Sequence, residues 1–302
     1  MYISQMIERY LSDVSYQAVN EQEVLSFGLL SCDGERLGAF VLNQKFAHHI
    51  QDNIVMVITS PDLKDEVGVT DHRGLILTEK PQELFWQLHK YMEKEPEYVR
   101  TSFPSSIAPT AKIGKYVSIP DENVIIEDGV VIEDFVTIYE HSHIKEHAVI
   151  RSGSRIGGVG YQEYKVGRQI ETVNHYGGTI IGRYVDIQNN TCVDRALFPW
   201  ENTVIGDYTK LDNLVHIAHA VRMGEACMCA AGVVIAGRCE IGNEVWIGLG
   251  ASVRNLIKIG DNSRVNIGSV VVDHVEAGQS VSGNYAVDHN KFLYQQLKLR
   301  KL

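Results

Sequence analysis

An apolar residue recurs at every sixth position along two long series of this 302-residue chain. The series are Ile126, Ile132, Ile138, Ile144, Ile150, Ile156, and then Ile205, Leu211, Ile217, Met223, Cys229, Ile235, Ile241, Ile247, Val253, Ile259, Val265, Val271. Six is not a multiple of the helical period of 3.6, so no α-helix keeps these residues on one face. A short, fixed period over so many repeats indicates stacked units. It predicts a parallel β-helix in which each hexad is one short strand and a turn.

The period breaks in three places. The step from Ile119 to Ile126 is seven residues, which predicts a bulge or a longer corner. The stretch between Ile156 and Ile181 contains "GGVGYQEYKVGRQIETVNHYGG", which is glycine-rich at both ends, and we expect it to loop out of the helix. The segment "RALFPWEN" keeps the register but places Pro199 at a core position, so a second local extrusion is expected there. Loops on a rigid scaffold often carry function.

The two ends of the chain lack the hexads. Before the repeats, "GERLGAFVLN", "NIVMVITS" and "RGLILTEK" read as strands, and "KPQELFWQLHKYMEKEP" reads as an amphipathic helix that Pro96 stops. The expected fold is therefore mainly β and has three parts. These are a small α/β domain at 1–103, a β-helix at 104–285, and a short C-terminal helix at 286–302.

Composition narrows the class of protein. Hydrophobic residues make up 44% and charged residues 22% of the chain, as in ordinary globular proteins. The net charge is −10 and no basic patch stands out, which argues against a nucleic-acid partner. The start of the chain does not resemble a signal peptide, and no apolar run is long enough to span a bilayer. Five cysteines without framework spacing indicate reduced thiols, so we expect a cytoplasmic protein.

Five stretches, taken with the hexads, resemble the UDP-3-O-acylglucosamine N-acyltransferases of lipid A synthesis. They are "FVLNQKF" (Phe40–Phe46), "GGVGY" (Gly157–Tyr161), "TCVDRAL" (Thr191–Leu197), "DNLVHIAHAV" (Asp212–Val221) and "AAGVVIAG" (Ala230–Gly237). The resemblance implies a left-handed β-helix, although parallel crossovers in general favour the right hand. It also implies a uridine-binding N-terminal domain and a homotrimer that works in lipid A or other surface-glycan synthesis.

The resemblance assigns the general base of an N-acyltransferase to His219. A histidine suits this work because its unperturbed pKa is close to neutral. Three hexads make one triangular coil, so residues eighteen apart are stacked, and the residue eighteen after His219 is Gly237. The family places an oxyanion-stabilising backbone N–H at the matching glycine. The structural alternatives are a packing or solvent-facing histidine and an ordinary corner glycine.

The same resemblance suggests residues that bind substrate. Phe40 and Asn43 have the family's spacing for an aromatic ring on uracil and an amide that hydrogen-bonds it, and Phe46 stands where the family often has tyrosine. Phe40 could instead be a core strand residue. Asp212 matches a family aspartate that could bind sugar hydroxyls or hold the histidine, or it is a corner acid. His216 could line the site or serve a structural role.

Departures from the family pattern leave the acyl donor open. The asparagine that usually follows the base is Ala220 here, the usual glycine-x-proline reads Gly283-Asn284-Tyr285, and only a short segment follows it. The expected co-substrate is an acyl-CoA or an acyl carrier protein, with no tightly bound cofactor. A short-chain or acetyl-CoA-dependent transferase acting on a UDP- or dTDP-amino sugar is the nearest alternative.

Two alternatives lie in other functional classes. The first is a zinc hydratase of the γ-carbonic anhydrase type. The His-x₂-His spacing here does not match the His-x₄-His of those enzymes, and Cys227, Cys229 and Cys239 fall at apolar slots where buried thiols pack as small hydrophobes. We therefore expect no metal site. The second is a non-catalytic nucleotide-sugar-binding protein.

Overall fold

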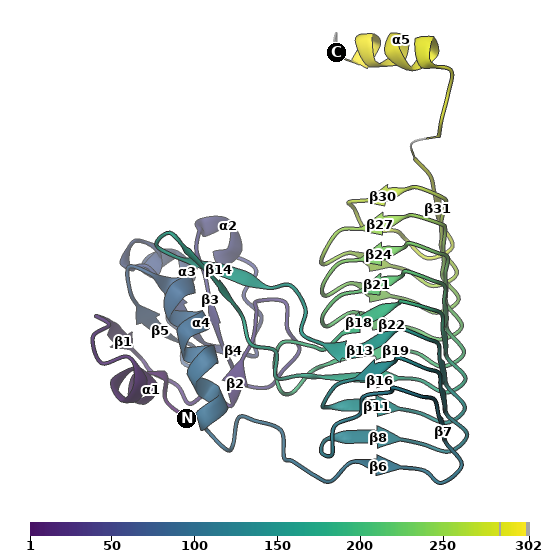
Figure 1. Ribbon diagram of the computed structural model, residues 1–302. Coiled ribbons are helices and arrows are strands. Elements are labelled where there is room, and N and C mark those ends of the chain that lie inside the picture. Colours follow the sequence, from purple (N-terminus) through teal and green to yellow (C-terminus); the bar gives the residue numbers. More distant parts are fainter. Residues whose placement is uncertain (284, 300–302) are drawn as a thin grey trace.

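A long β-helical coil stands beside a small N-terminal domain, and a single helix projects from the far end of the coil (Figure 1). The computed structural model describes residues 1–283 and 285–299. None of the helices in these ranges has both the length and the apolar character needed to cross a membrane.

The N-terminal domain is a five-stranded sheet with helices packed on it. Its strand order is β1-β5-β4-β3-β2, with β1 antiparallel to β5 and the other neighbours parallel. The strands are β1 (Gln17–Val19), β2 (Ser26–Phe27), β3 (Leu37–Phe40), β4 (Ile54–Thr59) and β5 (Gly74–Leu77). The helices are α1 (Ile3–Tyr10), α2 (Gln44–Ala47), α3 (Lys64–Val67) and α4 (Pro81–Tyr91), with 3₁₀ turns at Pro61–Leu63 and Met92–Lys94. The three expected strands, now β3 to β5, and the expected helix α4 are confirmed. The sequence did not predict the other elements.

The coil has three parallel faces, as the hexads predict. One face holds β10 (Thr137–Ile138), β13 (Arg155–Gly158), β18 (Cys192–Asp194), β21 (His216–Ile217), β24 (Val234–Ile235), β27 (Ser252–Val253) and β30 (Val270–Val271). The second holds β6 (Ser106–Ile107), β8 (Val124–Ile126), β11 (Ser142–Ile144), β16 (Gly178–Ile181), β19 (Asn202–Ile205), β22 (Arg222–Met223), β25 (Glu240–Ile241) and β28 (Lys258–Ile259). The third holds β7 (Lys112–Ile113), β9 (Val131–Ile132), β12 (Val149–Ile150), β17 (Asp186–Ile187), β20 (Lys210–Leu211), β23 (Met228–Cys229), β26 (Trp246–Ile247), β29 (Arg264–Val265) and β31 (Ser280–Val281).

The repeated aliphatic residues fill the inside of the coil. Every position of the two hexad series is buried, and all of them belong to one continuous apolar core. Residues of successive coils pair in parallel eighteen positions apart, as Ile217 does with Ile235. The corner residues Leu214, Ala220 and Arg238 have positive φ values of 60°, 56° and 61°, which turn the chain sharply between faces. The expected inward-facing hexads are confirmed.

All three expected breaks in the period are present. In the first coil Ile107 pairs with Ile126, which is one residue more than the later spacing and fits the longer corner. The stretch after Ile156 leaves the coil as an antiparallel hairpin, β14 (Glu163–Val166) and β15 (Gln169–Thr172), which reaches the N-terminal domain beside α4 (Figure 1). The segment around Pro199 also leaves the coil, and Leu197 and Phe198 join the core of the N-terminal domain.

The chain ends in α5 (His289–Leu299), which confirms the expected short C-terminal helix. It stands clear of the coil in Figure 1, and its side chains are exposed. The last part of the expected helix, 300–302, and Asn284 of the "GNY" stretch lie outside the described residues.

Candidate active site

His219 and Gly237 are stacked on adjacent coils. The strands before them, β21 and β24, pair in parallel, so both residues occupy the same corner of the prism. The N–H of Arg238 donates to the carbonyl of His219 at 3.0 Å, which fixes one corner on the other. A Cβ placed on Gly237 would lie 2.5 Å from Cε1 and 2.7 Å from Nε2 of His219, so only glycine leaves room for this ring.

The backbone N–H of Gly237 is free for a substrate. At two matching corners the N–H donates to a side chain of the next coil, as Glu225 does to Asn243 Oδ1 at 2.9 Å and Asn243 does to Asp261 Oδ1 at 2.6 Å. Within residues 1–283 and 285–299, the N–H of Gly237 has no acceptor. A donor beside an imidazole is the arrangement that stabilises an oxyanion next to a general base.

The imidazole of His219 is buried and uncharged. It is 8% exposed, and burial is the main cause that lowers its pKa to about 3. The charges of nearby histidine and arginine side chains lower it further. At neutral pH the ring therefore holds a lone pair that can accept a proton. Its Nδ1 is buried and meets no hydrogen-bond partner in the described chain.

His216 is held by a residue that the sequence analysis did not single out. Its Nε2 lies 2.9 Å from Oδ2 of Asp194, at the end of β18 one coil below. This hydrogen bond is the main cause that raises the pKa of His216. His216 therefore carries charge more readily than His219, and it faces outward from the coil with its side chain 41% exposed.

Asp212 lies at the opposite end of the same face from His219. It follows β20 at the corner that leads into β21, whereas His219 is at the corner that leaves β21. Its Oδ1 accepts the backbone N–H of Asn213 at 2.7 Å. Within one chain the structure does not bring Asp212 to His219.

A third histidine, also missed in the sequence analysis, contacts the stacked pair. The ring of His175 lies 5.5 Å from that of His219, centroid to centroid, at an interplanar angle of 76°. It comes from the segment that returns from the hairpin to the coil, forty-four positions before His219. The only sequence signal was a histidine inside a glycine-rich loop, in "NHYGG".

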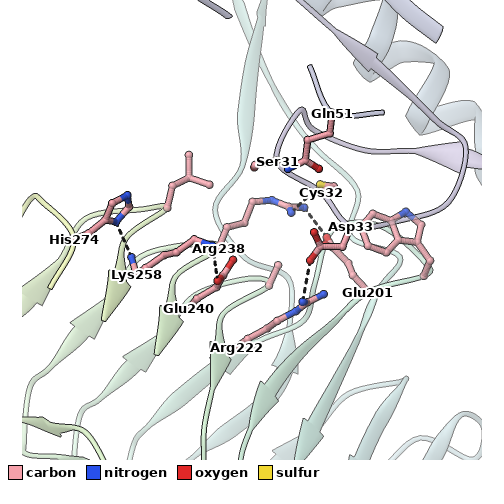
Figure 2. A pocket seen from close by; sticks show the side chains of 13 residues that line it. Ser31, Cys32, Asp33, Gln51, Glu201, Arg222, Arg238, Glu240, Lys258 and His274 are labelled. Atoms are coloured by element: carbon pink, nitrogen blue, oxygen red, sulfur yellow. Dashed lines mark hydrogen bonds and ion pairs between the residues drawn. The ribbon is translucent and has the colours of Figure 1, made fainter. Parts of the chain in front are cut away.

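A polar cavity of about 310 Å³ opens around the corner from the stacked pair, between the coil and the loop Ser31–Asp33 (Figure 2). Ala220 and Arg238, which directly follow His219 and Gly237, line it. The charged side chains labelled in Figure 2 pair with one another: Arg238 with Glu201 at 2.7 Å, Arg222 with Asp33 at 3.1 Å, and Lys258 with Glu240 at 2.8 Å.

The three residues expected to bind the nucleotide are in the N-terminal domain and do not line this cavity. Phe40 ends β3, is half-buried, and packs against Phe85 with ring centroids 4.8 Å apart. Asn43 occupies the position before the first residue of α2, makes no capping hydrogen bond with its side chain and is exposed, and Phe46 within that helix is 48% exposed. The structure therefore places Asn43 and Phe46 on one exposed rim and Phe40 partly in the core.

The cysteines lie apart from the histidines. Cys227, Cys229 and Cys239 are buried in the apolar core of the coil, and burial raises the pKa of Cys239 to about 11. In the described part of the chain no three histidine, cysteine or acidic side chains are grouped closely enough to hold a metal ion.

Comparison with known proteins first defines a class. Residues 123–158 match the family model described as bacterial transferase hexapeptide (six repeats). LpxA from Acinetobacter baumannii superposes with a TM-score of 0.52 at 23% identity, over 63% of this chain and 75% of that one. This neighbour has the left-handed β-helix predicted from the sequence, so the expected fold class is confirmed.

More specific similarity comes from proteins named UDP-3-O-acylglucosamine N-acyltransferase. The one from Campylobacter curvus is 30% identical over 130 residues, which are 43% of this chain and 40% of that protein. Number 2 of Legionella pneumophila is 39% identical over 141 residues, 46% of this chain and 40% of that protein. Number 1 of Francisella tularensis is 45% identical over 80 residues, 26% of this chain and 22% of that protein. The matches span two fifths or less of these relatives, and they confirm the resemblance seen in the motifs.

Proposed function

We propose that the chain is an N-acyltransferase that moves an acyl group from a thioester to the amine of a UDP-linked amino sugar, in lipid A or other surface-glycan synthesis. The observation that carries the proposal is the stacking of the His219 imidazole on Gly237, whose N–H has no acceptor in the part of the chain that the structure describes. The named relatives support the reaction class. Five free cysteines, of which all but Cys192 are buried, support a cytoplasmic enzyme.

The amine attacks the thioester carbonyl directly. As the C–N bond forms, Nε2 of His219 takes a proton from the amine, and the Gly237 N–H stabilises the negative charge on the carbonyl oxygen. The C–S bond then breaks, and the imidazolium returns its proton to the leaving thiolate. The scheme contains no acyl-enzyme, so it predicts sequential rather than ping-pong kinetics.

The nucleotide part of the substrate is assigned to the rim of the N-terminal domain. Phe40 offers a half-exposed ring edge, and Asn43 an exposed amide that can match the donors and acceptors of uracil. Phe46 and Asp212 complete the proposed substrate contacts. These residues are not gathered around His219 in one chain, so the proposal includes a homotrimer in which the sites lie between subunits.

The substrate is found by a matrix of UDP- and dTDP-amino sugars against acyl-CoA and acyl-carrier donors, read by mass spectrometry. The same matrix separates long-chain from acetyl transfer.

His219→Ala should lower kcat by about 10²–10⁴-fold while the oligomer persists. Near-normal turnover by this variant would reject His219 as the base. Binding of UDP-sugars with no acyl transfer from any donor would favour a non-catalytic binding protein, and stoichiometric zinc in the purified protein would favour the hydratase.

A further inference from the structure

His175 is fixed in position by the backbone around it. It lies between the hairpin and β16 and is 5% exposed. The N–H groups of Tyr176 and Gly177 donate to the carbonyls of Leu197 and Ala196, which ties this return segment to the second extrusion. On the other side, Nε2 of His89 donates to the carbonyl of Asn174 at 2.8 Å. The ring of His175 is therefore held by two insertions that meet.

The hydrogen bonds define which nitrogen of His175 carries the proton. Its Nδ1 lies 2.9 Å from the backbone carbonyl of Val173, and a carbonyl can only accept, so Nδ1 is the protonated nitrogen. Neutral His175 therefore presents a lone pair on Nε2. This Nε2 is buried and meets no hydrogen-bond partner in residues 1–283 and 285–299.

Two buried nitrogens, Nε2 of His175 and Nδ1 of His219, thus have no hydrogen-bond partner among the described residues, and they belong to rings in contact. Gly160 packs next to them. A Cβ on Gly160 would lie 3.1 Å from Oδ2 of Asp194, 3.2 Å from Nε2 of His175 and 3.3 Å from Cβ of His219. An acceptor, a second acceptor and the base therefore converge beside a residue that lacks a side chain.

We propose that His175 is a positioning residue whose Nε2 accepts a hydrogen bond from the Nδ1–H of His219, through a small rotation of the two rings that are already in contact, and so leaves Nε2 of His219 as the basic nitrogen. This inference rests on the proposed function. The residue after the base is Ala220, so no neighbouring carboxylate in sequence does this work.

The charges around His175 favour its acceptor form. Burial is the largest cause and lowers the pKa of His175, the hydrogen bond to the Val173 carbonyl and the charge of Asp194 raise this pKa, and Arg195 and Arg238 lower it. His216 faces the same space but is paired with Asp194. Neutral His175 can accept a hydrogen bond from His219 through its Nε2 lone pair. A charged His175 has no such lone pair and would repel the His219 imidazolium. When His219 takes the proton of the amine, the Asp194 carboxylate and the His175 lone pair both stabilise the resulting cation.

The first test needs no substrate. Diethyl pyrocarbonate acylates an imidazole at a nitrogen with a free lone pair, and peptide mass spectrometry gives the rate at His219 with exposed His48 as the internal control. In His175→Leu the Nδ1–H form of His219 loses a hydrogen bond, so its labelling at Nε2 should slow by up to about tenfold. In His175→Gln the amide oxygen still accepts, and the rate should stay near that of the wild type. Equal rates in all three proteins would overturn the proposal.

The second test uses turnover. His175→Leu should lower kcat by at least about tenfold with little change in KM, and should move the acid limb of the pH profile to lower pH because the imidazolium loses an acceptor. His175→Gln should restore most of kcat. A merely structural role would lower activity in both variants and leave the pH profile in place, and that result would overturn the proposal. If the wild type acylates no amino sugar, the proposed function fails, while the labelling still tests the contact of His175 with His219.

Discussion

The imidazole of His219 lies over Gly237 so closely that a methyl group on Gly237 would come within 2.5 Å of its Cε1. The stack follows from the eighteen-residue repeat, because β21 and β24 pair without a break in register. One corner of the prism therefore carries both the proposed base and the proposed oxyanion donor. Since neither group is on a mobile loop, the geometry is set by the coil itself.

Replacing Gly237 by alanine should displace the imidazole rather than unfold the coil. The new methyl overlaps Cε1 and Nε2 of His219, and the ring is the movable partner. We expect kcat to fall by about 10²–10³-fold, the usual effect of disturbing an oxyanion site. Gly283→Ala is the matched control, because no atom lies within 4 Å of its ideal Cβ. Equal loss in both variants would contradict the assignment.

The protein should lose stability when the pH falls through the acid range, and His89 should contribute. Burial is the main cause that lowers the pKa of His89 to about 4. The folded state thus disfavours the charged ring. The contribution of neutral His89 to the free energy of unfolding is therefore fully present above about pH 6.5 and is lost as the pH falls from there to about 4. In this window His89→Phe should reduce the slope of unfolding free energy against pH by up to about 1.4 kcal/mol per unit.

Urea unfolding at pH 7.5, 5.5 and 4.5 measures this slope. His89→Phe also removes the hydrogen bonds of His89 to Tyr98 and Asn174, so the variant should be less stable at pH 7.5. The comparison therefore concerns the slope and not the absolute stability. Parallel pH dependences in the two proteins would contradict the prediction.

The ion pair of Arg238 with Glu201 should matter far more than the other pairs in the same cavity. The two side chains are 11% and 4% exposed, and Oε1 of Glu201 also accepts the N–H groups of Leu197 and Phe198. Glu201→Gln leaves a buried guanidinium without its counter-charge, and we expect a cost of about 3 kcal/mol. Glu240→Gln removes the exposed pair with Lys258 and should cost less than about 0.5 kcal/mol. Thermal unfolding of the two variants side by side measures the difference, and similar losses would be the contrary result.

The hairpin should stabilise the N-terminal domain through one of its faces. Tyr164 on β14 is 6% exposed and lies 6.4 Å from Trp86 of α4, ring to ring. Tyr164→Ala should therefore cost about 3 kcal/mol. Ile170 on β15 is 67% exposed, and Ile170→Ala should be almost neutral. Unfolding midpoints of the two variants give the comparison, and a neutral Tyr164→Ala would show that the hairpin does not hold the domain.

The coil was predictable from the sequence because each hexad repeats the same local pattern. The inward residue is aliphatic in every repeat, as at Ile217 and Ile235, so local pattern and global fold agree. Stacking of His219 on Gly237 followed from counting alone. The first extrusion was visible as a break in the period with glycines at both ends, and the second as a proline, Pro199, at a core position.

The partners of the site were not predictable, because they depend on where the extruded segments return. His175 lies beside His219 only because the segment after the hairpin returns there, and Asp194 meets His216 because the second extrusion lets β18 pair with β21 at an offset of twenty-four residues instead of eighteen. Phe198 shows the same limit: it stands within the coil sequence but packs in the core of the other domain. Contacts of this kind are set by tertiary structure and leave no periodic trace.

The hairpin leaves the coil and returns with the next strand still in register, since Ile144 pairs with Ile181 as it would have paired with a residue eighteen positions on. The length and chemistry of the inserted segment therefore do not disturb the stacking above or below it. On such a scaffold, shape and specificity can evolve separately. The coil can stay the same while a change in the inserted segment alters which side chains lie beside the neighbouring imidazole.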